Sequence, residues 1–98
     1  MLTEKDYCDY NTCVAFEELG CPINSLMRLH LYDAQKWLRE KKGINVLVMQ
    51  ITIEGSGMRR YASYIQLDDK IWLCRYYSLY EEALLEGIKE AVKLIKEK

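Results

Sequence analysis

The C-terminal stretch, residues 78–97, is the part of the sequence that most limits how this chain can fold. Its apolar residues recur at spacings of three and four, which places them on one stripe of an α-helix: Tyr80, Ala83, Leu84, Ile88, Ala91, Val92 and Ile95. Acidic residues in the first predicted turn and lysines near the end complement the helix dipole. A helix with such a stripe must bury it, so we expect the rest of the chain to offer it an apolar face.

Two details of this predicted helix concern its start and its middle. Ser78 and Glu81 have the spacing of a capping box, in which each side chain binds the backbone amide of the other residue. Gly87 leaves two interpretations open. If it is exposed, it costs the helix about 1 kcal/mol relative to alanine. If it is buried, it marks a close contact between the helix and a strand.

The middle of the chain predicts three strands, at residues 44–53, 59–67 and 71–77. The first strand is apolar on both faces in its first half, so we expect that half to be covered on both sides. One of its faces carries Leu47, Met49, Ile51 and Ile53, and the other carries Ile44, Val46 and Val48. The connections at 54–57 and 68–70 are short, which predicts an antiparallel meander.

The N-terminal third predicts two helices. Asn11 or Thr12 would cap a short helix over residues 13–19, with inward-facing candidates at Val14, Ala15 and Leu19. Residues 26–32 fit a strand or a helix equally well, and a helix is predicted from Asp33 to a terminator at Gly43. Residues 1–10 have little periodicity, and we expect them to fray or to add a short extended piece.

These elements predict one small α+β domain over residues 1–98, in the order α-α-β-β-β-α, with the long C-terminal helix on one face of the sheet. The net charge of −1 gives no general attraction to nucleic acid or to an anionic membrane. The N-terminus lacks an apolar signal region, and the longest apolar run, residues 46–49, is too short to cross a bilayer. We therefore expect a cytoplasmic protein with reduced cysteines and no membrane partner.

The residues that could bind metal or carry catalysis do not form a recognised motif. The spacing of Cys8, Cys13, Cys21 and His30 lacks the paired knuckles of a structural zinc site. We expect Cys13 and Cys21 to be small buried hydrophobes, with Cys8 on a loose end. His30, the only histidine, has no accompanying nucleophile motif and is expected to be structural. Cys74 is expected to pack. We predict no enzyme activity, no metal and no cofactor.

A basic and aromatic cluster on the second and third strands is the best candidate for a binding surface. Its members are Arg59, Arg60, Tyr61, Tyr64, Arg75 and Tyr77. Tyrosine and arginine are enriched at protein interfaces, so the preferred hypothesis is a non-enzymatic module that self-associates, for example as a homodimer, or binds another protein. The alternative is weak nucleic-acid binding, because such a surface can stack bases and hold phosphates.

Two segments, AQKWLREKKGI at 34–44 and YEEALLEGIKEAVKLI at 80–95, resemble a group of short uncharacterised proteins from gut bacteria, their phages and mobile elements. This resemblance implies a bacterial or phage protein of the cytosol and transfers no functional residue. The order from Ala34 onward is also similar, in topology only, to the double-stranded-RNA-binding domain. That family meets phosphates with a basic start to its last helix. This chain has Glu81 and Glu82 there, which repel phosphate.

Overall fold

The computed structural model describes residues 7–22, 29–52, 55, 57 and 59–97. Its elements are α1 (Tyr10–Glu18), α2 (Leu31–Lys42), β1 (Ile44–Thr52), β2 (Arg59–Leu67), β3 (Lys70–Tyr77) and α3 (Tyr80–Lys96), so the predicted α+β order is confirmed. Several residues discussed above lie outside the described ones: residues 1–6 and 26–28, Ile53, Glu54 and Ser56. Among the described residues, none of the helices combines the length and the apolar character needed to cross a membrane.

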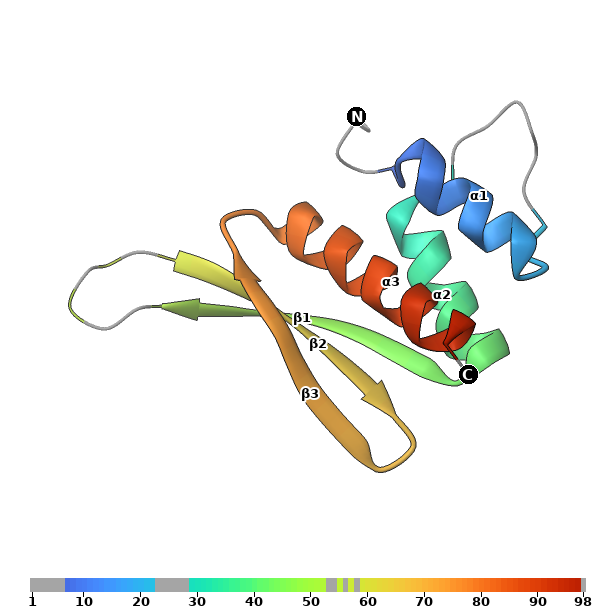
Figure 1. Cartoon of the computed structure of the whole chain (residues 1–98). Helices are drawn as coiled ribbons and strands as arrows, with labels where there is room; N and C mark the ends of the chain where they lie inside the picture. The colour runs from blue at the N-terminus through green and yellow to red at the C-terminus, as the bar shows by residue number, and fades with distance from the viewer. Residues whose placement is uncertain (1–6, 23–28, 53–54, 56, 58, 98) are drawn as a thin grey trace.

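The three strands form one antiparallel sheet in the order β1-β2-β3, as the short connections predicted. Figure 1 shows the helices gathered on one side of this twisted sheet, where α3 contacts all three strands and α2 contacts β1. Between β2 and β3 the chain turns through Asp68 and Asp69. Asp68 has a φ of 56°, a left-handed conformation that aspartate tolerates better than most residues.

Helix α3 buries the stripe that its sequence predicted. Its buried residues are Ala83, Leu84, Gly87, Ile88, Ala91 and Val92. The predicted capping box is wrong, because the N-cap position is Leu79 and no side chain in the described part of the chain caps the helix. The helix thus begins one residue later than the box requires, and a leucine side chain cannot accept a hydrogen bond.

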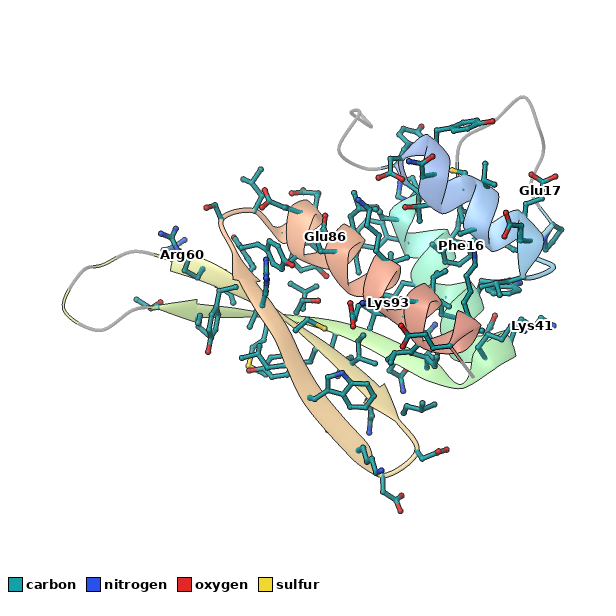
Figure 2. The ribbon with its side chains drawn as sticks, viewed as in Figure 1. Phe16, Glu17, Lys41, Arg60, Glu86 and Lys93 are labelled. Carbon is teal, nitrogen blue, oxygen red and sulfur yellow. The ribbon has the colours of Figure 1, made fainter. Side chains whose placement is uncertain are left out.

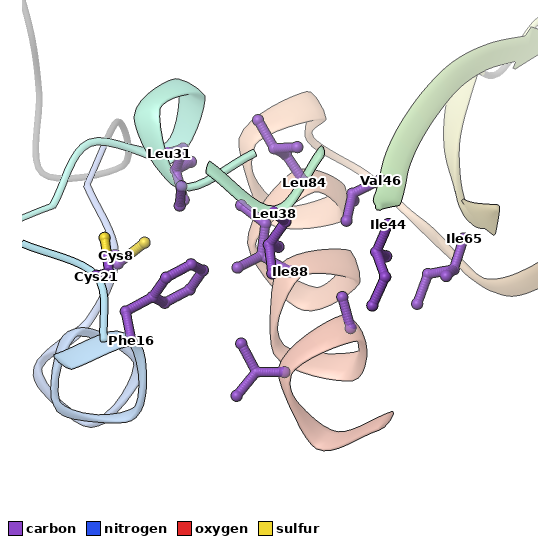
Figure 3. Packing of buried hydrophobic residues seen from close by; sticks show 13 residues of the cluster. Cys8, Phe16, Cys21, Leu31, Leu38, Ile44, Val46, Ile65, Leu84 and Ile88 are labelled. Atoms are coloured by element: carbon purple, nitrogen blue, oxygen red, sulfur yellow. The ribbon is translucent and has the colours of Figure 1, made fainter. Parts of the chain in front are cut away.

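The hydrophobic core lies between α3, α2 and the helix-facing side of β1 and β2 (Figure 3). Phe16 of α1 enters this core fully buried, and its ring meets Trp37 of α2 edge to face at 5.6 Å between centroids. Cys8 is also fully buried, so its expected place on a loose end is wrong. Its backbone N–H donates to the Leu29 carbonyl at 2.8 Å, beside a bridge between Tyr7 and His30.

Helix α1 begins earlier than predicted because a different residue caps it. Asp9, rather than Asn11 or Thr12, occupies the N-cap, and its carboxylate accepts from the Thr12 N–H at 2.8 Å. The other carboxylate oxygen lies 2.9 Å from Lys89 Nζ on α3. Nearer the end of α1, Glu18 pairs with Lys96 of α3 at 3.0 Å. The two helices therefore run in the same direction, joined near both ends of α1.

Helix α2 also begins earlier than the predicted Asp33, at Leu31. His30 is its N-cap, and its Nδ1 accepts from the Tyr32 N–H at 3.2 Å. The only histidine in the sequence therefore has a structural position, half-buried at a helix start. Gly43 ends the helix as predicted, with a φ of 68°.

Gly87 lies where α3 crosses the sheet, and the interpretation of a close contact with a strand is confirmed. A Cβ atom added at this position would overlap Ser63 Oγ and would lie 2.7 Å from Val46 Cγ1. Ser63 is fully buried beneath the helix. The thiol of Cys74 approaches its hydroxyl, but a thiol is a weak donor, so Ser63 lacks a strong hydrogen-bond partner among the described residues.

We expect Gly87→Ala to lower the free energy of unfolding by up to about 2 kcal/mol. Overpacking costs roughly 1–3 kcal/mol and is offset by a helix propensity gain of about 1 kcal/mol. The measurement is urea denaturation of a double-mutant cycle with Ser63→Ala. Removing the Ser63 hydroxyl should reduce the free-energy cost of the added methyl group. The double variant should therefore be more stable than the sum of the two single-variant effects predicts. A stability gain for Gly87→Ala alone would contradict the close contact.

A second prediction concerns Asp9 and acid. Burial raises the pKa of the Asp9 carboxyl, but hydrogen bonds from Thr12 and Lys89 outweigh it and lower this pKa from 3.8 to about 2. A carboxyl with a lower pKa in the folded state stabilises the fold fully above pH 3.8, and this contribution is lost as the pH falls toward 2. The measurement is the free energy of unfolding as a function of pH.

The matched control is Asp9→Asn, because asparagine caps a helix about as well as aspartate but carries no charge. Near pH 7 the variant should be less stable than the unchanged protein by about the amount that the unchanged protein loses in acid through Asp9, because the charge is removed while the cap is kept. This amount is modest, since both partners of the Asp9–Lys89 pair are about 40% exposed. Between pH 4 and pH 2 the variant should lose less stability than the unchanged chain. Parallel profiles for the two proteins over this range would refute the role given to Asp9.

Candidate interaction surface

The face of the sheet opposite the helices carries the most notable surface of the molecule. Ser63 lies under α3, and side chains alternate along a strand, so Leu47 and Tyr64 belong to the opposite face. The pairing register then sets two apolar rows across the three strands. One row is Leu47, Tyr64 and Leu73, and the other is Met49, Ala62 and Tyr76. We call these six residues, together with Ile71, the open face.

Five large apolar side chains of the open face are exposed to solvent. Their exposed fractions are 42% for Leu47, 56% for Met49, 58% for Ile71, 40% for Leu73 and 56% for Tyr76. Taking roughly 180 Å² for each fully exposed residue of this size, these fractions leave up to about 450 Å² of surface, most of it apolar. The largest apolar patch of a typical monomer measures about 300–600 Å² and is often functional. The open face thus has the size of a binding surface.

The rows that border these two apolar rows contain polar residues at both ends of the sheet, beside Ile71 at one end and Ile51 at the other. At the end near the β2–β3 turn, Asn45 donates from its side-chain amide to Gln66 Oε1 at 3.4 Å, and Ile71 completes this row. At the other end, Arg60 pairs with Ile51, and the alternation places both on the same side as Tyr64. Protein interfaces have this anatomy of an apolar centre and a polar rim.

Both edges of the sheet are poorly suited to pairing with a further strand. On β1, the side-chain amide of Gln35 donates to the Val46 carbonyl at 2.6 Å, so α2 covers that part of the edge. On β3, the register shifts opposite Ser63 and Tyr64, which marks a β-bulge, and Lys70 and Arg75 are exposed. Bulges and charged side chains are devices that discourage edge pairing. The sheet is therefore more open to contact across its face than along its edges.

The structure divides the basic and aromatic cluster that the sequence suggested. Arg60 and Tyr64 lie on the open-face side. Tyr61 turns toward α3 instead, where its ring meets Tyr80 edge to face at 5.9 Å. Arg59 is exposed at the start of β2, opposite Thr52. Figure 2 shows Arg60 at this end of the sheet, away from Phe16 and the helices around it.

The remaining two members, Arg75 and Tyr77, line a groove of about 320 Å³ between β3 and α3. Glu86 and Glu90 of α3 line the same groove, so Arg75 lies in mixed charge rather than in a basic patch. Burial raises the pKa of the Tyr77 hydroxyl, and Glu86 raises it further. The six residues therefore do not form one continuous cationic surface.

Cys74 lines the same groove, but its chemistry does not suggest a nucleophile. Burial raises the pKa of its thiol, and the Glu90 carboxylate adds to the effect. A thiol is reactive mainly as the thiolate, which a raised pKa disfavours. Cys74 packs against the core as a partly buried residue, as expected from the sequence.

The other cysteines lie around α1. Cys8 and Cys21 are buried, and the Cys13 thiol makes a weak contact with the Cys8 carbonyl at 3.8 Å. Burial raises the pKa of the Cys21 thiol, with further increases from Asp33 and Cys13. In the described part of the chain, no group of three or more His, Cys, Asp or Glu side chains is placed to hold a metal ion.

Sequence reasoning missed most of the open face. It gave weight to arginines and tyrosines, whereas the structure adds Leu47, Met49, Ile71, Leu73 and Tyr76. The signal was present in β1, where residues of both faces are apolar over the first half of the strand. That pattern led to an expectation of cover on both sides. The helices cover the side of Ile44 and Val46, and Leu47 and Met49 are exposed on the other.

Comparison with known proteins identifies no relative of this chain. No protein-family model matches the chain, and neither a curated protein nor a solved structure is detectably similar to it.

Proposed function

We propose that this protein is a non-enzymatic interaction module whose open face binds another protein chain. One observation supports this proposal above the others: large apolar side chains are exposed together on a sheet face that none of the described helices covers. Exposing such a continuous surface to water is unfavourable, and burying it against a partner gains roughly 25 cal/mol for each Å² removed from water.

The same geometry favours a protein partner over a nucleic acid. A surface that binds single-stranded nucleic acid combines stacking aromatics with several cations that track the phosphates. The open face offers Tyr64 and Tyr76, but Arg60 is the only charged residue at its register positions among those described. Arg75 instead shares its groove with two glutamates. We propose a cytosolic setting for this activity, in line with the resemblance to bacterial and phage proteins.

Site-specific photo-crosslinking in the producing cells tests the proposal. A benzoylphenylalanine at Tyr76 should give defined adducts with protein, because this side chain lies on the open face and is 56% exposed. The matched control is the same replacement at Tyr10, a 79% exposed tyrosine on α1. Adducts at Tyr76 that are absent at Tyr10 are expected. Equal or no adducts at the two positions would overturn the proposal.

A binding titration tests the nucleic-acid alternative. With one cation at the open face, we expect no saturable binding of labelled single-stranded DNA or RNA by fluorescence anisotropy, even at about 50 mM salt, where phosphate contacts are strongest. Saturable binding that weakens steeply with salt, and that is reduced by Arg60→Gln and by Tyr64→Leu, would favour the alternative over a protein partner.

A further inference from the structure

We infer that the partner of the open face is a second copy of this chain, stacked sheet against sheet in a two-fold symmetric dimer. This inference rests on the proposed function and names the partner of the same surface. Three features of the described residues support it: the exposed apolar area of the open face, the order of its rows along the strands, and sheet edges that are poorly suited to strand pairing.

The apolar area matches what a dimer of ordinary size requires. A stable interface buries about 800 Å² of each partner. About 56–65% of that surface is non-polar, so each copy must contribute on the order of 450–520 Å² of apolar surface. The exposed residues of the open face supply up to about 450 Å², most of it apolar, by the estimate given above. The polar residues bordering the rows complete the interface.

The order of the rows makes the open face complementary to itself. Consider a two-fold axis that lies between the two sheets and runs perpendicular to the strands. This axis places each apolar row of one copy over the other apolar row of the second copy. The row of Leu47, Tyr64 and Leu73 then faces the row of Met49, Ala62 and Tyr76. The Tyr64 ring then lies over the position of Ala62 in the second copy, where the exposed Met49 and Tyr76 flank a small, fully buried residue, and the same arrangement repeats by symmetry. Large residues opposite small ones are how packed layers interdigitate.

Charge does not oppose this arrangement. The same axis places Arg60 of one copy over the end of the sheet that carries Asn45 and Gln66 in the other, so the two arginines lie at opposite ends of the interface. The amide oxygens of Asn45 and Gln66 are acceptors for a guanidinium group. No acidic residue occupies the register positions of this face among the described residues, so no carboxylate would be buried.

The sheet edges argue for contact through the face. The contact of Gln35 occupies the Val46 carbonyl near the start of β1, and the bulge interrupts β3, so both edges are less regular than two uninterrupted strands would be. Stacking of two sheets needs no backbone partner across the interface. Packed sheets lie about 10 Å apart and are held by side chains.

Light scattering on a size-exclusion column tests the inference with the purified full chain at two concentrations and two salt levels. The expected mass is twice the 11.6 kDa of one chain. The dimer should persist at high salt, because apolar contacts are not screened. The melting temperature of the unchanged protein should also rise with concentration, as linked association requires. This second measurement needs no variant.

Three variants show which surface makes the contact. Leu73→Lys and Tyr76→Glu place a charge within the apolar rows and should each weaken the dimer about 30-fold or more. Tyr10→Glu makes the same tyrosine replacement on α1 and should leave the dimer unchanged. Circular dichroism and thermal melting confirm that each variant is folded, and charges at exposed strand positions are tolerated by sheets.

The outcomes separate the inference from the proposed function. A monomeric chain at every concentration overturns the inference, as does a dimer that neither open-face variant weakens. If the chain is monomeric and Tyr76 nevertheless gives adducts with a different protein, the inference fails and the proposed function stands. If the chain is monomeric and Tyr76 gives no specific adduct, both fail.

Discussion

The close passage of α3 over the sheet at Gly87 is the contact on which the rest of the structure depends. With no side chain at that position, the helix lies almost directly on Ser63 and Val46, and its buried stripe can then reach all three strands. The same placement lets α3 support α1 and α2 from its other side. A bulkier residue at this crossing would lift the helix from the sheet, and the shared core between the three helices and the sheet would lose its packing.

A second physical constraint is that the described helices all lie on one side of a single sheet, so its other face is left uncovered by them. Three strands can be covered on one face by one long helix with the help of a second, but the chain then has no described element left for the other face. β1 nevertheless carries apolar residues on both faces. An apolar face without a helix is energetically unfavourable for an isolated chain, and it is a common property of surfaces that are buried in an assembly. The proposed dimer resolves this imbalance without any further part of the protein.

The sequence predicted the element order, the antiparallel meander and the buried stripe of α3 because these follow from periodicity and from short connections. It was less successful at helix starts. Asp9 caps α1 through Thr12 and is also held by Lys89, which is distant in sequence, and His30 is an unusual N-cap. Phe16 is the largest residue in the fully buried core, yet its partner Trp37 belongs to another helix. Contacts of this kind between distant segments are not visible in local patterns.

The candidate surface also could not be predicted from local sequence patterns. Arginines and tyrosines that are neighbours in the sequence, such as Arg60 and Tyr61, point to opposite faces of a strand, so a cluster in the sequence became two different surfaces in space. The apolar rows could have been predicted only by knowing that Leu47 lies opposite Tyr64 and that Tyr64 lies opposite Leu73. This knowledge requires the pairing register of β1 with β2 and of β2 with β3, and the bulge in β3 shifts the second register in the middle of the strand.

The hydrogen bond from Gln35 to the Val46 carbonyl has a consequence for the size of any assembly. If the β1 edge of one copy paired with the β3 edge of the next, each addition would present a new free edge, and growth of that kind would have no natural end. Two sheets that meet face to face about a two-fold axis leave no equivalent surface for a third copy. By occupying a backbone acceptor on β1, one glutamine side chain helps to exclude the open-ended form of association and leaves available the form that stops at two.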